Sequence, residues 1–257
     1  MIDDDTIRLA HDLAEASGAV IRRHFRQPFD IEQKGDDSPV TVADRGAERE
    51  IRAILGERRP DDGIVGEEYG AERPDAERVW VIDPIDGTRS FVIGRPVFGT
   101  LIALLANGAP VLGVIDQPII GERWVGAAGH PTRFNDKPVR VRACAGLDKA
   151  HLATTSPHQF AAADRATVFD LGEAAASMVY GDDCYNYAGL ASGWIDGVVE
   201  DGLKLHDFAA LEPVVTGAGG IMTDWRGNPL NAQSAGDVLA CGDKRLHEIL
   251  LRRLGRA

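Results

Sequence analysis

Hydrophobic residues in the first half of the chain change from helical spacing to the spacing of strands. Two early segments have hydrophobic residues at every third or fourth position, which predicts amphipathic helices over 6–25 and 42–55. Asp5 or Thr6 is expected to cap the first helix, and the residue types of 33–39 predict a turn. Short β-rich runs then predict strands over 79–82, 97–105, 111–115 and 123–127. These strands indicate a mostly antiparallel, buried sheet.

Beyond Pro138, short hydrophobic runs alternate with segments of helical spacing, which is typical of an α/β lobe. The expected strands are 151–155, 194–200 and 238–241. The expected helices are 161–171, 186–192, 208–218 and 244–254. We therefore predict an α/β fold that forms one catalytic unit from two lobes, an α+β lobe over 1–138 and an α/β lobe over 139–257.

Composition and charge narrow the possible functions. The 257 residues include 28 Lys and Arg against 40 Asp and Glu, a net charge of −12. A sequence-independent nucleic-acid binder needs a basic surface, so we expect no nucleic-acid partner. Three cysteines without a C-x-x-C motif argue against a zinc or disulfide framework. Without a signal peptide or an apolar run of about 20 residues, we expect a cytoplasmic protein with no membrane partner.

Two carboxylates end one of the predicted strands. Asp83 and Asp86 lie three residues apart in D-P-I-D-G-T, where Pro84 fixes one backbone angle and Gly87 frees another. If the turn directs both carboxylates at one point, they repel each other unless a proton or cation lies between them. Oxygen ligands without clustered Cys or His favour Mg²⁺ over zinc. The N–H groups of Gly87 and Thr88 can hold a phosphate at the same turn, which suggests metal-assisted phosphoester hydrolysis.

Two other acidic segments accompany this motif. The upstream segment is Gly66-Glu67-Glu68, and the downstream segment places Asp207 in the first turn of a late helix. Considered alone, D-x-x-D-G is a turn, the Glu pair is solvated surface and Asp207 is a helix cap. Taken together and in this order, with the closing G-A-G-G, the three segments resemble the inositol monophosphatase family of Mg²⁺-dependent phosphatases over nearly the whole chain.

This resemblance implies a fold and a metal site. The fold would be the layered α-β-α-β-α sandwich of the inositol monophosphatase and fructose-1,6-bisphosphatase type, assembled as a homodimer. Two or three Mg²⁺ ions per subunit are implied, with Glu68 holding water at a third ion. The implied ligands are Glu67, Asp83, Asp86, Asp207 and the backbone carbonyl of Ile85.

The resemblance also implies catalytic roles. Glu67 would serve as both ligand and base, while the Thr88 hydroxyl and Asp44 would hold the attacking water. Gly87 and Thr88 would bind the phosphate, and Lys34 matches a lysine of the family. In such a mechanism the ions activate water for in-line attack on phosphorus and stabilise the leaving group.

Several segments resemble one branch of this family, the histidinol phosphatases. They are residues 91–105, 113–118, 154–157, 183–187 and 207–211. The branch hydrolyses L-histidinol phosphate in histidine biosynthesis. The chain departs from its pattern at His206, where an aromatic residue is usual, and at Asp182, where Gly is frequent.

L-Histidinol phosphate carries an ammonium and an imidazole, so its pocket should offer acidic or acceptor groups. Glu200 and Asp183 match acidic positions that contact substrate in the family, and Glu200 would bind the ammonium. Asn186 would hydrogen-bond the imidazole, and Arg89 would contact either the phosphate or a neighbouring subunit. Considered alone, an Asp or Asn at such positions more often caps a turn or bonds the backbone.

The leading hypothesis is a metal-dependent phosphomonoesterase acting on a small phosphate ester, L-histidinol phosphate. One alternative in the same reaction class is an inositol-1-phosphatase or a broader phosphatase of sugar phosphates or nucleotide 3′-phosphates. The alternative from another class is a non-catalytic regulator associated with RNA or transcription. The complete acidic set and the charge of −12 argue against that regulator.

Overall fold

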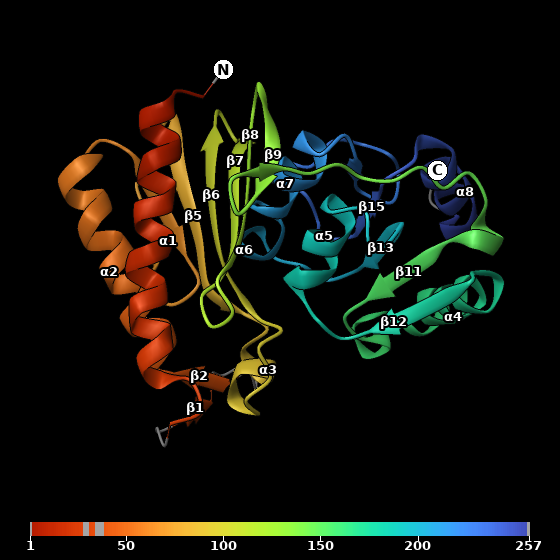
Figure 1. Ribbon diagram of the computed structural model, residues 1–257, viewed down its shortest axis with the longest axis horizontal. Helices are drawn as coiled ribbons and strands as arrows, with labels where there is room; N and C mark the ends of the chain where they lie inside the picture. Colours follow the sequence, from red (N-terminus) through yellow and green to blue (C-terminus); the bar gives the residue numbers. More distant parts are fainter. Residues whose placement is uncertain (1, 28–30, 34–38, 256–257) are drawn as a thin grey trace.

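The computed structural model describes residues 2–27, 31–33 and 39–255, and Figure 1 shows how its elements stack in layers. The first layer contains the long helices α1 (Asp4–His24) and α2 (Val42–Arg58). These helices pack side by side on one face of an eight-stranded sheet.

Three helices fill the space between the eight-stranded sheet and a second, five-stranded sheet. They are α5 (Cys184–Ala191), α6 (Leu205–Phe208) and α7 (Leu211–Gly217). The outer face of the second sheet is covered by α4 (Ala162–Ala174) and α8 (Lys244–Leu254). The order of layers is therefore α-β-α-β-α, as predicted.

The eight-stranded sheet has the strand order β10-β9-β8-β7-β6-β5-β3-β4. Its strands are β3 (Gly63–Gly66), β4 (Gly70–Glu72), β5 (Arg78–Asp86), β6 (Gly99–Ala106), β7 (Ala109–Gln117), β8 (Glu122–Ala127), β9 (His130–Phe134) and β10 (Lys137–Pro138). All neighbours pair antiparallel except β3 and β5, which are parallel. The expectation of a mostly antiparallel sheet is confirmed.

The five-stranded sheet has the order β12-β11-β13-β15-β14. Its strands are β11 (His151–Thr154), β12 (Ser177–Tyr180), β13 (Gly197–Glu200), β14 (Ile221–Thr223) and β15 (Val238–Cys241). Strand β11 runs parallel to both β12 and β13, so the carboxyl ends of these three strands meet at one edge. The chain changes sheets between β10 and β11, and the two-lobe division at 138/139 stays a prediction.

The remaining elements are short. They are β1 (Ile31–Gln33), β2 (Pro39–Thr41), the helix α3 (Thr88–Val92) and single turns of 3₁₀-helix at Leu147–Lys149 and Pro157–Gln159. Most of the predicted turn over 33–39 lies outside the described residues; its first and last residues, Gln33 and Pro39, pair in the antiparallel ladder of β1 and β2. Within the part of the chain described above, no helix is long and apolar enough to cross a membrane.

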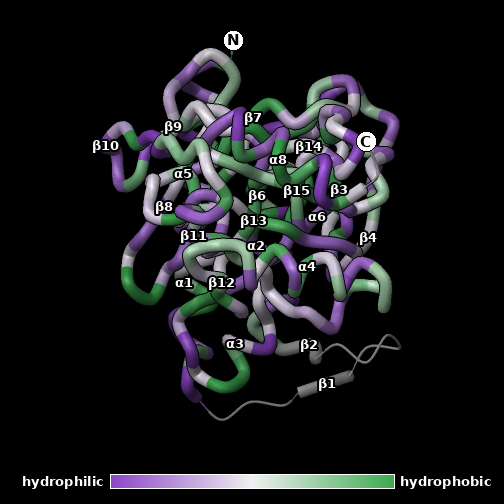
Figure 2. Tube along the Cα trace, turned by 90° about the vertical axis from the view of Figure 1, so that its right-hand side faces the viewer, coloured by the Kyte–Doolittle hydropathy of each residue, from purple (hydrophilic) through white to green (hydrophobic). Residues whose placement is uncertain are grey.

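The hydrophobic side of α1 explains its place on the sheet. Leu9 and Leu13, one helical turn apart, are fully buried and belong to one core cluster with Trp80, Ile102 and Leu104 of β5 and β6. Burying such a side chain contributes about 1.5–3 kcal/mol. Figure 2 shows hydrophobic segments through the interior of the molecule and polar segments toward its outside.

Several predicted boundaries are wrong, and the strand expected over 194–200 begins only at Gly197. Asp3, not Asp5 or Thr6, caps α1, because its carboxylate accepts a hydrogen bond of 2.7 Å from the N–H three residues later. The single helix expected over 208–218 is instead α6 and α7, separated at positions 209 and 210. Pro213 has no N–H to donate to the carbonyl four residues earlier, so a continuous helix would lack that bond.

Candidate active site

The end of β5 is irregular where the D-P-I-D-G-T motif lies. Asp83 and Asp86 both pair with β6, but the register shifts between them. The Asp83 carboxylate accepts a hydrogen bond of 3.0 Å from the N–H of Ile85, and the Thr88 hydroxyl donates to the Ile85 carbonyl at 2.9 Å. The shift and these bonds give the segment a fixed shape, with Gly87 in the left-handed region at φ 83°.

Three carboxylates converge beside this segment. Asp83, Asp86 and Asp207 each offer a carboxylate oxygen, and the three oxygens lie within 4.8 Å of one another. Asp207 comes from α6, which packs against β5, and its carboxylate accepts a hydrogen bond of 2.7 Å from the N–H of Lys204. The Asp86 carboxylate accepts from the N–H of Cys184 at 2.7 Å, which ties β5 to the start of α5. Both halves of the chain therefore supply this cluster.

Burial and mutual repulsion perturb these carboxyl groups. Burial raises the pKa of Asp83 well above its usual range, and the charges of Glu67 and Asp86 raise it further. Burial and the charge of Asp183 raise the pKa of Asp86 well above its usual range. Burial also raises the pKa of Asp207. A divalent cation would relieve both penalties, and a set of oxygen ligands suits Mg²⁺. The residues present therefore fit the metal that the resemblance implies.

Glu67 follows β3, and its N–H donates to the Ile82 carbonyl at 3.1 Å. Its carboxylate is outside the set of three mutually close oxygens, yet its charge is the largest carboxylate contribution to the raised pKa of Asp83. His206 lies between Glu67 and Asp207, with its Nε2 at 4.0 Å from Glu67 Oε1 and 3.5 Å from Asp207 Oδ1. His206 stands where the histidinol phosphatases usually have an aromatic residue, and its imidazole lies beside the acidic cluster.

Sequence analysis missed Glu48, a fully buried carboxylate on α2 that supports the turn after β3. It accepts hydrogen bonds from the N–H of Glu68 at 2.8 Å and of Tyr69 at 3.3 Å, and from Arg52 Nε at 2.7 Å. A Cβ on Gly66 would lie 1.9 Å from Glu48 Oε1, so only glycine fits there. The signal that could have identified Glu48 is a charge on the hydrophobic face of a helix.

Two other acidic candidates of the first half have buried carboxylates. Asp44 is buried in the first turn of α2, and its charge contributes to the raised pKa of Asp83. Glu68, with a side chain only 2% exposed, lies 3.6 Å from Arg45 Nε. Lys34 is outside the described residues.

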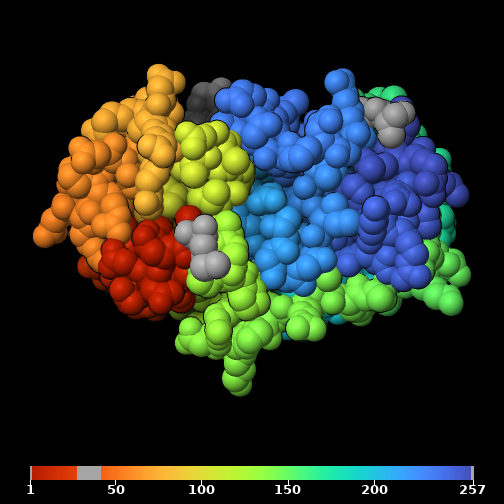
Figure 3. All heavy atoms as spheres, turned by 90° about the horizontal axis from the view of Figure 1, so that it is seen from above, coloured from red at the N-terminus to blue at the C-terminus, as the bar shows by residue number. Residues whose placement is uncertain are grey.

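A cavity of about 170 Å³ adjoins the cluster between the two sheets. Figure 3 shows the first and second halves of the chain in contact over a broad boundary on one face of the molecule. The cavity is lined by Asp86, Thr155, Gln159, Asp183, Cys184, Tyr187, Glu200, Leu203, Asp207 and Leu211. It includes two of the predicted substrate contacts, Asp183 and Glu200, but neither Asn186 nor Arg89.

Glu200 forms one wall of the cavity at the carboxyl end of β13. Burial raises its pKa to about 8, although hydrogen bonds oppose the shift. Its Oε1 accepts from the N–H of Thr155 at 2.7 Å, and its Oε2 accepts from the Gln159 amide and the Thr154 hydroxyl. Gln159, which sequence analysis did not select, therefore fixes the position of this carboxylate.

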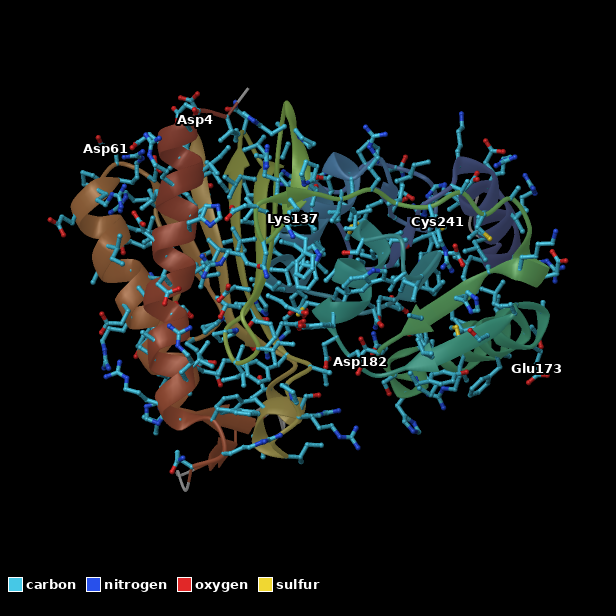
Figure 4. The ribbon with its side chains drawn as sticks, viewed as in Figure 1. Asp4, Asp61, Lys137, Glu173, Asp182 and Cys241 are labelled. Atoms are coloured by element: carbon cyan, nitrogen blue, oxygen red, sulfur yellow. The ribbon has the colours of Figure 1, made fainter. Side chains whose placement is uncertain are left out.

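Asp183 lies in a strained loop. The backbone takes positive φ at Gly181, Asp182 and Asp183 in succession, and Figure 4 shows Asp182 in this loop between β12 and α5. Burial, and next the charge of Asp182, raise the pKa of Asp183 to about 6, while the charge of Arg89 opposes the shift. The Asn186 amide donates to the Gly181 carbonyl at 2.8 Å, so this side chain supports the loop.

The layered fold and the acidic cluster are those expected of a metal-dependent phosphatase, and comparisons with known proteins identify the family. The profile of the Inositol monophosphatase family matches residues 3–257, so the chain belongs to this family. Enzymes of this family hydrolyse phosphate esters with the help of a metal ion.

Three known proteins illustrate the similarity. The chain is 48% identical over 251 residues to the bifunctional phosphatase IMPL2, chloroplastic, of Arabidopsis thaliana, covering 94% of this chain and 72% of that protein. It is 38% identical over 223 residues to the histidinol-phosphatase of Chlorobaculum parvum, covering 86% of each. The solved structure of an inositol monophosphatase from Zymomonas mobilis is 53% identical, with a TM-score of 0.91 and 98% of each chain covered.

Proposed function

We propose that this protein is a Mg²⁺-dependent histidinol phosphatase, which hydrolyses L-histidinol phosphate to L-histidinol and phosphate in histidine biosynthesis. The observation that carries this proposal is the cavity with the half-buried Asp183 and the buried Glu200 beside the acidic cluster. An acidic wall suits a leaving group that carries an ammonium. The similarity to a histidinol-phosphatase of another organism supports the same substrate.

In this proposal the metal ligands are Asp83, Asp86 and Asp207, together with Glu67 and the Ile85 carbonyl. Bound Mg²⁺ supplies positive charge that offsets the charge of the phosphoryl oxygens and makes water more acidic. The observed convergence of three carboxylates supports this assignment, because a cation would offset the burial and repulsion that raise their pKa values.

The protein's own groups have separate tasks in the proposed reaction. The N–H groups of Gly87 and Thr88 bind the phosphate. The Thr88 hydroxyl and Asp44 orient the attacking water, and Glu67 accepts its proton. Water oxygen bonds to phosphorus as the ester bond opposite it breaks, and the leaving oxygen takes up a proton to give the alcohol.

The leaving group is then directed into the cavity. The substrate ammonium pairs with Glu200 and favours its ionised form, and Asp183 contributes a second negative charge on the same side. Arg89, whose charge already acts on Asp183, contacts either the phosphate or a second subunit. Asn186 acts on this pocket through the 181–183 loop, since its amide holds the Gly181 carbonyl.

A second candidate activity is hydrolysis of inositol 1-phosphate. The observation that favours it is the 53% identity to an inositol monophosphatase of known structure. Both activities would use the same acidic cluster and differ only in what fills the cavity. Assembly as a homodimer in the cytoplasm belongs to the same proposal, and light scattering of the purified protein tests the dimer.

The proposal is tested by phosphate release from L-histidinol phosphate with and without Mg²⁺. We expect turnover that a chelator abolishes and added Mg²⁺ restores. Asp83→Asn and Asp207→Asn should each lower kcat by about 100-fold or more, or about 2.7 kcal/mol. The matched control is Asp61→Asn, because Asp61 is exposed and remote from the cluster (Figure 4). Absence of turnover with every phosphate ester would instead favour a non-catalytic regulator.

A further inference from the structure

One buried polar group of the cavity has no role in the reaction described above. Tyr187 lies on α5, its side chain is 2% exposed, and it lines the cavity beside Glu200 and Asp207. Its hydroxyl is buried and finds no hydrogen-bond partner among the residues that the structure describes. A buried hydroxyl without a partner is unfavourable, because the hydrogen bonds it made to water are lost on folding.

The carboxylates nearest Tyr187 are hydrogen-bonded to other donors. Both oxygens of Glu200 already accept hydrogen bonds, from Thr155 on one side and from Gln159 on the other. The Asp86 carboxylate accepts from Cys184. Burial and the nearby charges of Glu200, Asp86 and Asp207 raise the pKa of the phenol, so it keeps its proton. Tyr187 therefore brings a protonated, unpartnered donor to the lining of a cavity that also contains four carboxyl groups.

We propose that Tyr187 is a specificity-determining residue whose hydroxyl donates a hydrogen bond to an acceptor atom on the leaving group of the substrate. For L-histidinol phosphate this acceptor is the unprotonated imidazole nitrogen, so the inference rests on the proposed function. The substrate ammonium cannot take this place, because it has donors only and would leave the phenolic proton unpaired. The ammonium instead pairs with Glu200.

This assignment differs from the one expected for the neighbouring residue. The Asn186 amide is engaged by the Gly181 carbonyl, and Asn186 does not line the cavity. Tyr187 does line it, and it comes from the same helix. The Tyr187 hydroxyl, unlike the Asn186 amide, has no hydrogen-bond partner within the described residues and is available to a substrate.

The test uses Tyr187→Phe, which removes only the hydroxyl, and two substrates. L-Phenylalaninol phosphate retains the ammonium and phosphate of L-histidinol phosphate but replaces the imidazole by a phenyl ring. We expect the variant to lower kcat/KM for L-histidinol phosphate about tenfold or more, and to leave kcat/KM for L-phenylalaninol phosphate within about twofold. An equal loss for both substrates, or no loss for either, would overturn the inference.

The matched control is Tyr185→Phe on the same helix, because the Tyr185 hydroxyl is already bonded to Glu122. We expect Tyr185→Phe to lower the Tm without changing the preference between the two substrates. Tyr187→Phe should leave the Tm of the substrate-free protein unchanged or raise it. A fall in Tm as large as that of Tyr185→Phe would show that the Tyr187 hydroxyl is structural, which also overturns the inference.

Failure of the proposed function gives a different result. In that case the unmodified protein turns over other phosphate esters but not L-histidinol phosphate, and the imidazole assignment falls with it. If the unmodified protein prefers L-histidinol phosphate and Tyr187→Phe keeps the full preference, the proposed function stands and only the role of Tyr187 is refuted.

Discussion

Replacement of Glu48 by alanine removes the carboxylate that supports the turn between β3 and β4. The carboxylate accepts from two backbone N–H groups, of Glu68 and Tyr69, and pairs with Arg52. Glu67 lies in the same turn, so the variant should affect both stability and the acidic cluster. Glu48 itself does not line the substrate cavity.

The expected loss of stability follows from these contacts. Removing one partner of a buried ion pair costs about 3–5 kcal/mol, because the remaining groups lose their acceptor. The Arg52 side chain is 17% exposed and can recover part of its hydration, so we expect the lower end, about 3 kcal/mol. In a protein of this size that corresponds to a fall in Tm of roughly 6–12 °C. Glu48→Gln keeps one acceptor oxygen and should lose about half as much.

Two measurements on the same variants test this reasoning. Thermal unfolding gives the stability, and phosphate release over a range of Mg²⁺ concentrations gives the concentration for half-maximal activity. We expect Glu48→Ala to need more Mg²⁺, because Glu67 is no longer held. The matched control is Glu50→Ala, an exposed glutamate on the same helix. If Glu48→Ala and Glu50→Ala gave the same Tm and the same Mg²⁺ dependence, the positioning role of Glu48 would be refuted.

Three further predictions concern residues at and around the acidic cluster and the cavity. Gly87→Ala should lower kcat by at least tenfold in a steady-state assay, because φ is 83° and the new Cβ would lie 2.9 Å from Asp183 Oδ2; unchanged kcat would contradict this. Burial raises the pKa of Asp83 above its usual range and that of Asp183 to about 6. The folded metal-free chain therefore binds protons that the unfolded chain releases, so its stability should fall as pH rises from about 4 to 6 and above. Thermal unfolding in chelator should show this loss and saturating Mg²⁺ should remove it, whereas equal slopes in both would contradict the charge argument. Gln159→Leu should raise KM with little change in kcat, since Glu200 loses a donor, and an unchanged KM would contradict this.

The sequence predicts the long, regular elements of this fold well. Helices α1 and α2 and strands β5 to β8 have strong hydrophobic periodicity and lie where it places them. Strands β12 and β14 are not predicted: β14 is only 3 residues long, and β12 is an edge strand whose positions are half-buried or exposed, so neither has the fully buried run of a core strand. The break at α6 and α7 depends on one missing N–H at Pro213, which a hydrophobic pattern does not show.

The residues of the site also differ in whether the sequence alone predicts them. The clustering of Asp83 and Asp86 could be expected from their spacing at the end of a strand, and the structure brings Asp207 to them from a distant segment. Glu48 and Gln159 carry no motif, because their importance comes from backbone groups that meet them only in the folded chain. Tyr187 has the sequence signature of a core residue, and only its unpaired hydroxyl distinguishes it.

We propose that the acidic cluster and its cavity select a phosphate ester with a cationic, nitrogen-bearing leaving group. The most direct measurement is kcat/KM for phosphate release with Mg²⁺ from L-histidinol phosphate, inositol 1-phosphate and adenosine 3′,5′-bisphosphate. We predict a preference for L-histidinol phosphate of about 100-fold, or about 2.7 kcal/mol. An equal or reversed preference would contradict the claim.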